Sequence, residues 1–137
     1  MITVVIPALN EEETIGSVID FAFSYDKVSE VIVVDDKSID NTVEIAGAHS
    51  AKVIISDILG KGASMKEGVE HATNELLIFL DGDINPYPHF TLQLLAEPLL
   101  NYKAEFVKST FSRNAGRVTE LVAKPLLSFL FPQPGAL

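Results

Sequence analysis

The sequence contains no cysteine and no apolar segment long enough to cross a bilayer. Without cysteine the chain forms no disulfide, thiolate nucleophile, cysteine-ligated zinc site or iron–sulfur cluster, and this composition fits a reducing compartment. Its longest apolar runs, such as Leu76–Leu80, are too short to span a membrane, and its first residues lack the regions of a signal peptide. We therefore expect a cytoplasmic protein with no membrane span.

Basic side chains are also scarce, with 10 Lys or Arg against 19 Asp or Glu. The resulting acidic surface argues against nonspecific nucleic-acid binding, which needs a basic face to displace counterions. Residues 1–100 carry 5 basic and 17 acidic side chains, whereas residues 101–137 carry 5 basic and 2 acidic ones. The first part is compatible with a divalent-cation site and the second with an anionic substrate, although solvated surface explains most such charges.

At 137 residues, with 47% of them hydrophobic, the chain is long enough for one globular domain with its own core. Apolar β-branched runs predict strands at Ile2–Ile6, Glu30–Asp35, Lys52–Ser56, Glu75–Asp81 and Ala104–Thr110. Helical periodicity predicts helices at Glu11–Ser24, Thr42–Ala48, Gly62–Ala72, His89–Asn101 and Val118–Phe131, the first two capped by Asn10 and Asn41. This alternation predicts an α/β fold whose mostly parallel sheet has helices on both faces.

Polar clusters follow three of the predicted strands. They are Pro7-Ala8-Leu9-Asn10-Glu11, Asp35-Asp36-Lys37-Ser38 and Asp81-Gly82-Asp83. Because an open parallel sheet binds its ligands beyond the carboxyl ends of the strands, we expect the three clusters to share one crevice. Taken singly, Asn10-Glu11 is better explained as a helix cap than as a ligand site, and Asp35-Asp36 fits simple turn chemistry.

Asp81 and Asp83 form the most informative pair because they follow the strongly apolar run Leu76–Leu80. Residues i and i+2 of an extended chain project to the same side, so the two carboxylates converge. Such convergence is costly without a cation, and Mg²⁺ or Mn²⁺ bound by one or two carboxylates plus phosphate oxygens meets that need. A turn with solvated aspartates is the alternative.

Two further segments have features of anion sites. Gly60-Lys61-Gly62 places a lysine at a predicted helix start, although its spacing is not that of a P-loop. At Gly116–Thr119, backbone N–H groups, a guanidinium and a hydroxyl precede the last predicted helix and would hold a phosphate or carboxylate. The alternative for Lys61 is a surface lysine in a turn, and the alternative for Gly116–Thr119 is an ordinary helix start. The three histidines show no metal-ligand spacing.

In this order, the segments VVIPALNEEETIG, VVDDKSIDNT, GKG and LDGD resemble the GT-A glycosyltransferases of the family-2-like group, which use nucleotide-diphospho-sugars. DGDINPYPHFTLQLLAEPLL and FVKSTFSRNAGRVTELVAKPLLSFLFPQPG narrow the resemblance to the glucosyl-3-phosphoglycerate synthase family, with mannosyl-3-phosphoglycerate-forming relatives close to it. The resemblance implies a Rossmann-like GT-A fold. It also implies Mg²⁺- or Mn²⁺-dependent transfer of a hexose, glucose in the first place, to 3-phosphoglycerate with retention of configuration.

The same resemblance implies roles for individual residues. The nucleotide-diphospho-sugar donor would be bound by Pro7, Ala8, Leu9, Asn10, Glu11, Asp36, Ser38, Lys61 and Asp81. Asp83 and Asp81 would hold the metal, and Lys61 would act with Asp83 in catalysis. The acceptor would be bound by Gly116, Arg117, Val118 and Thr119, in agreement with the basic balance of residues 101–137. Residues 1–100 would be the donor and metal part of a single domain, and residues 101–137 the start of its acceptor part.

The chain departs from this family in two ways. Lys37 stands where related sequences usually have glycine. Family members also continue well beyond this length, and their continuation supplies a histidine that completes the metal site. The resemblance therefore implies the N-terminal part of such an enzyme, inactive or weakly active alone. Apolar residues near its end, such as Phe129 and Phe131, would favour a homo-oligomer.

Other functions stay open on the sequence. VVDD at a strand end, Asp81 and Lys108 mimic the acidic pocket and lysine of a receiver-like phosphoacceptor module, although a complete strand–helix unit precedes VVDD here. A second alternative is a non-catalytic GT-A remnant that acts by association with another chain. Membrane-associated polyprenyl-phosphate glycosyltransferases share the early motifs, but GRVTEL points away from them.

Overall fold

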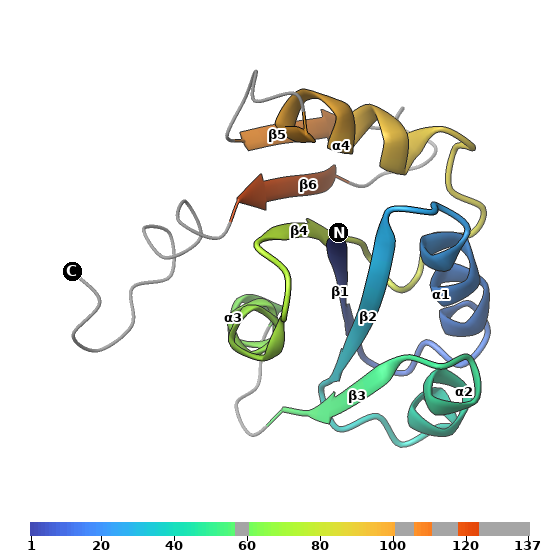
Figure 1. Ribbon diagram of the computed structural model, residues 1–137. Coiled ribbons are helices and arrows are strands. Elements are labelled where there is room, and N and C mark those ends of the chain that lie inside the picture. Colours follow the sequence, from blue (N-terminus) through green and yellow to red (C-terminus); the bar gives the residue numbers. More distant parts are fainter. Residues whose placement is uncertain (57–60, 101–105, 111–117, 124–137) are drawn as a thin grey trace, which may run out of the picture.

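The computed structural model describes residues 1–56, 61–100, 106–110 and 118–123. Strands and helices alternate along most of this chain (Figure 1). They are β1 (Ile2–Ala8), α1 (Ile15–Phe23), β2 (Val28–Asp35), α2 (Thr42–Ala48), β3 (Lys52–Ile55), α3 (Lys61–His71), β4 (Leu76–Phe79), α4 (Thr91–Leu100), β5 (Phe106–Thr110) and β6 (Val118–Ala123). No helix in the described part of the chain is long and apolar enough to cross a membrane.

The strands form one six-stranded sheet in the order β3-β2-β1-β4-β6-β5. Strand β1 lies parallel to β2 and β4, and β2 lies parallel to β3. Strand β6 is antiparallel to both β4 and β5. The predicted α/β fold with a mostly parallel sheet is confirmed, and the strand order brings the carboxyl ends of β1, β2 and β4 to one edge.

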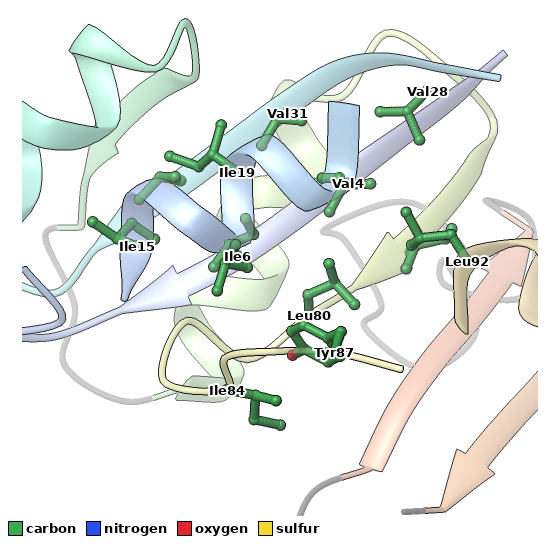
Figure 2. Packing of buried hydrophobic residues seen from close by; sticks show 14 of the residues in the cluster. Val4, Ile6, Ile15, Ile19, Val28, Val31, Leu80, Ile84, Tyr87 and Leu92 are labelled. Carbon is green, nitrogen blue, oxygen red and sulfur yellow. The ribbon is translucent and has the colours of Figure 1, made fainter. Parts of the chain in front are cut away.

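Helices cover both faces of this sheet, as predicted (Figure 1). Alternate residues of a strand point to opposite faces, so Val4 and Ile6 pack with side chains of α1, α2 and α4, whereas Val5 packs with α3. Figure 2 shows Val4 and Ile6 facing Ile15 and Ile19 of α1. Burial on both faces explains why β1 has the continuous apolar run from which it was predicted.

The predicted helix Val118–Phe131 is wrong in its first part, because Val118–Ala123 is strand β6. Apolar residues at 118, 121 and 122 have helical spacing, but the segment is rich in β-branched side chains. Its backbone hydrogen bonds are made with two neighbours at once, since Glu120 pairs with Phe79 of β4 and Lys108 of β5. Long-range pairing, which periodicity does not report, decides the structure here. Residues 124–131 lie outside the described residues.

Helix α1 begins four residues later than predicted, and Asn10 is not its N-cap. Asn10 has a φ of 53°, and Thr14 occupies the capping position. The N–H groups of Glu11 and Glu12 donate to side chains beyond β2 instead of opening the helix. Asn41 does precede α2 as predicted, but its side chain makes no capping hydrogen bond.

Glu30 lies at the amino edge of the sheet, where β1, β2 and β4 begin, and its carboxylate is held by hydrogen bonds. Glu30 accepts hydrogen bonds from the Thr3 hydroxyl at 2.8 Å and from the Thr73 N–H at 2.9 Å. Partial burial opposes ionisation, but these hydrogen bonds and the charge of Lys52 outweigh it and hold the pKa of Glu30 below its ordinary value. At this edge, hydrogen bonds and the Lys52 ammonium group stabilise the carboxylate.

Helix α3 approaches the sheet closely because Gly68 faces β1. A Cβ atom at Gly68 would lie 2.3 Å from Cγ1 of Val5, which is far inside contact distance. We expect Gly68→Ala to lower the free energy of unfolding by roughly 1–2 kcal/mol, after the gain in helix propensity, in urea unfolding.

The matched control is Gly47→Ala in α2, where an added Cβ meets no atom within 4 Å. This variant should gain stability, by about 0.5–1 kcal/mol. If Gly68→Ala were as stable as Gly47→Ala, the close packing of α3 on β1 would be refuted.

Candidate functional site

A cavity of about 230 Å³ opens at the carboxyl edge of the parallel strands. Its walls come from the β1–α1 loop, the end of β2, the first turn of α3 and the turn that follows β4. The lining residues are Pro7, Ala8, Leu9, Glu11, Asp36, Ser64, Asp81, Gly82 and Asp83. The three polar clusters expected in one crevice are thus brought together.

Acidic side chains from three separate segments surround this cavity. Glu11 belongs to the loop after β1, Asp36 to the loop after β2, and Asp81 and Asp83 to the turn after β4. Asp81 is 8% exposed, whereas Asp83 is exposed to solvent. Like charges gathered at one cavity repel each other unless a cation or protons offset them. Hard carboxylate oxygens are the donor set that Mg²⁺ and Mn²⁺ prefer.

The described residues do not surround a cation completely. Among them, no group of three or more His, Asp or Glu side chains is arranged to hold a metal ion. Mg²⁺ typically takes one or two protein carboxylates and fills its remaining positions with water and phosphate oxygens. Asp81 and Asp83 therefore fit a cation that is shared with a phosphate-bearing ligand.

The loops after β1 and β2 are joined by reciprocal hydrogen bonds, which we call the loop clasp. It consists of Asn10 N–H to Ser38 Oγ (2.8 Å), Ile39 N–H to Asn10 Oδ1 (2.9 Å), Glu11 N–H to Thr42 Oγ1 (2.8 Å), Glu12 N–H to Asp40 Oδ2 (3.2 Å) and Asn41 N–H to Glu12 Oε2 (3.1 Å). Backbone donors of each loop thus find side-chain acceptors on the other. The clasp fixes the β1–α1 loop, which carries Glu11, relative to β2.

Two aspartates hold the second loop of the clasp in shape. Asp35, only 1% exposed, accepts hydrogen bonds from the N–H of Ser38 at 2.9 Å and from its hydroxyl. Asp40 accepts from the N–H and hydroxyl of Thr42 and from the N–H of Glu12. Desolvation opposes ionisation of Asp40, but these donors outweigh it and lower its pKa. Both carboxylates therefore act as acceptors within the loop.

Six of the nine donor-site residues expected from the sequence line the cavity, together with the expected metal ligand Asp83. Pro7, Ala8, Leu9, Glu11, Asp36, Asp81 and Asp83 all lie in its wall. Asn10 and Ser38 instead belong to the loop clasp, so they shape the loops that carry the wall. Their expected contact with the donor stays a prediction.

The other expected residues lie elsewhere in the chain. Lys61 is the first residue of α3, one helical turn before the cavity residue Ser64. Val118 and Thr119 open strand β6 instead of a helix, which removes the helix-terminus argument for an anion site there. Gly116 and Arg117 lie outside the described residues.

Sequence reasoning missed one lining side chain, Ser64. It is 1% exposed, lies on the first turn of α3 and faces the cavity that Asp36 and Asp81 also line. The GKG turn had already placed the start of this helix near the strand ends. A search of the first helical turn for small polar residues would have found Ser64.

Lys37 has a φ of 61°, in the left-handed region that favours glycine. Glycine, which the resemblance leads one to expect at this place, would adopt this conformation without strain. The side chain of Lys37 is exposed. Lysine at this place therefore leaves the backbone strained next to the clasp. The neighbouring Asp36 still lines the cavity.

Comparison with protein families agrees with this fold and site. The family model for glycosyl transferase family 2 matches residues 3–128, and the chain belongs to this family. The match supports the glycosyltransferase resemblance over a receiver-like module.

Several similar proteins are glucosyl-3-phosphoglycerate synthases. The enzyme of Mycolicibacterium paratuberculosis is 36% identical, over 99% of this chain and 49% of its own length. The Mycobacterium tuberculosis enzyme in complex with Mn²⁺, UDP-glucose and phosphoglyceric acid has 34% identity and a TM-score of 0.76, over 96% of this chain and 51% of that one. Its complex with Mg²⁺ and UDP has 33% identity and a TM-score of 0.75, over 96% and 50%.

These likenesses establish the GT-A fold predicted from the sequence. The chain spans about half the length of the curated relatives it matches.

The strain at Lys37 yields a stability prediction. We expect Lys37→Gly to raise the free energy of unfolding by about 0.5–1 kcal/mol, because relief of the left-handed strain exceeds the added entropy of the unfolded chain. Thermal unfolding measures this gain as a higher Tm. Ser50→Gly is the matched control, since Ser50 has a φ of 70° after α2, away from the cavity, and should be stabilised similarly. A Lys37→Gly chain less stable than the parent would show that the lysine side chain compensates for its backbone.

Proposed function

We propose that this chain binds a nucleotide-diphospho-sugar together with Mg²⁺ or Mn²⁺ in the cavity at the carboxyl ends of β1, β2 and β4. We further propose that it serves the transfer of a hexose, glucose in the first place, to 3-phosphoglycerate with retention of configuration. One observation carries this proposal: acidic side chains of three loops converge on one cavity in a glycosyl transferase family 2 domain. The solved relative that binds Mn²⁺, UDP-glucose and phosphoglyceric acid supports the choice of ligands.

The charge of the cavity makes metal dependence a necessary part of this proposal. A diphosphate is an anion, and it approaches a wall that carries Glu11, Asp36, Asp81 and Asp83. Without a cation, repulsion between like charges opposes binding. A divalent cation would neutralise the diphosphate, both when the donor binds and when the nucleoside diphosphate leaves the hexose. Asp81 and Asp83 are the residues that would hold it.

The chain's own residues have distinct roles in this proposal. Pro7, Ala8 and Leu9 form the wall contributed by β1 and the start of its loop, against which the donor packs. Lys61 at the start of α3 would contact the donor diphosphate, as the resemblance implies. The loop clasp keeps the two nucleotide-side loops in one arrangement, so binding need not order them.

The acceptor part of the proposal rests on the resemblance. Gly116, Arg117, Val118 and Thr119 would bind 3-phosphoglycerate, whose phosphate and carboxylate suit a guanidinium and a hydroxyl. The basic balance of residues 101–137 agrees with an anionic acceptor. The donor cavity lies in the acidic part of the chain, so the two substrates would be selected by regions of opposite charge.

Calorimetric titration of UDP-glucose with and without Mg²⁺ tests the proposed donor site. We expect Mg²⁺ to strengthen binding and Asp83→Ala to weaken Mg²⁺-supported binding about 10- to 100-fold, the effect of losing one charged contact of ~1.5–3 kcal/mol. Asp26→Ala is the matched control, because Asp26 is exposed in the turn between α1 and β2. Equal affinities for the parent and Asp83→Ala in saturating Mg²⁺ would refute the metal role of this turn.

A further inference from the structure

We propose that the hydroxyl groups of Thr14 and Tyr87 are positioning devices that fix the turn carrying Asp81 and Asp83. Neither residue is in the wall of the donor cavity, and each hydroxyl meets the turn at a backbone carbonyl oxygen. The inference rests on the proposed function, since it concerns how the two aspartates are aligned to share a cation.

The two hydroxyls hold consecutive carbonyl groups. Tyr87 Oη donates a hydrogen bond to the carbonyl oxygen of Asp81 at 2.8 Å, in a buried contact. Thr14 Oγ1 donates to the carbonyl oxygen of Gly82 at 2.5 Å. The donors come from different parts of the chain, one from the start of α1 and the other from the segment between β4 and α4.

The orientations of these two carbonyl groups together set the backbone conformation of Gly82. Each carbonyl lies in the plane of one peptide group, and the two planes meet at the Cα atom of Gly82. Their relative orientation is set by the φ and ψ angles of that residue, which glycine leaves unusually free. Holding both planes therefore fixes the relative placement of the Cα atoms of Asp81 and Asp83. Two carboxylates that repel one another need such a constraint if they are to stay aligned for one cation.

Both donors are anchored on helix α1. The ring of Tyr87, 6% exposed, stacks on Phe21 of α1 with ring centroids 5.2 Å apart and an interplanar angle of 14°. Figure 2 shows Tyr87 among the buried side chains that pack with α1. Thr14 is the N-cap residue of the same helix. The helix that follows the β1–α1 loop thus also determines the geometry of the acidic turn.

Thr14 does not use its hydroxyl in the way expected of its position. Threonine at an N-cap ordinarily accepts a hydrogen bond from a free N–H of its own helix, but Thr14 makes no such bond. Its hydroxyl donates across the fold to Gly82 instead. A local stabilising contact is absent while a contact with the proposed metal turn is present, which is the pattern expected where function overrides local structure.

The test uses Thr14→Val and Tyr87→Phe, which each remove one hydroxyl and keep the shape of the side chain. Affinity for Mn²⁺ is measured by electron paramagnetic resonance in saturating UDP, and affinity for UDP is measured by calorimetry in EDTA. We expect each variant to bind Mn²⁺ about three- to tenfold more weakly, the effect of one lost hydrogen bond, while the metal-free UDP affinity stays within about twofold. Thr14→Ser, which keeps the hydroxyl, should bind Mn²⁺ like the parent.

Tyr25→Phe is the matched control, because it removes a tyrosine hydroxyl beyond the other end of α1. It should leave both affinities unchanged. The proposal is overturned if both test variants bind Mn²⁺ within about twofold of the parent, or if they lose Mn²⁺ and metal-free UDP affinity equally, since that assigns the hydroxyls a purely structural role. If Mn²⁺ does not raise the affinity of the parent chain for UDP, the proposed function itself is overturned. This outcome is seen with the parent chain and needs no variant.

Discussion

The parallel pairing of β1 with both β2 and β4 is the constraint on which the rest of the structure depends. Strand β1 is buried on both faces, so its register is set by packing with helices on each side. Parallel strands end at the same edge, so three loops with polar sequences leave the sheet side by side. The loop clasp, the acidic turn and the cavity all follow from that shared edge.

The two edges of the sheet differ in how their acidic side chains are accommodated. At the amino edge, Glu30 is stabilised as a carboxylate by hydrogen bonds from Thr3 and Thr73. At the carboxyl edge, acidic side chains of different loops converge on a cavity that opens to solvent. In the proposed function, a bound cation with its diphosphate would offset the like charges of these carboxylates. On this proposal, the same residues would favour a donor that binds together with a metal ion.

The parallel strands and the gathering of Glu11, Asp36, Asp81 and Asp83 could be predicted, because burial on both faces leaves continuous apolar runs whose ends are readable. The start of α1 could not be predicted, because the N–H groups of Glu11 and Glu12 donate to side chains distant in sequence and the helix begins only after them. Strand β6 was also missed, because its pairing with β4 and β5 overrides a local helical pattern. Contacts between distant segments likewise decide that Ser38 holds a loop while Ser64 lines the cavity.

Paramagnetic broadening of amide NMR signals by Mn²⁺, with UDP-glucose present and Mg²⁺ as the diamagnetic reference, tests the central claim most directly. The claim is that metal and donor bind together at the carboxyl edge of the parallel strands. The account predicts that the amides of Leu9, Asp36 and Gly82 lose intensity first, while those of Glu30 and Thr73 at the opposite edge keep theirs. Broadening that begins at Glu30 and Thr73, or that is uniform over the chain, would contradict it.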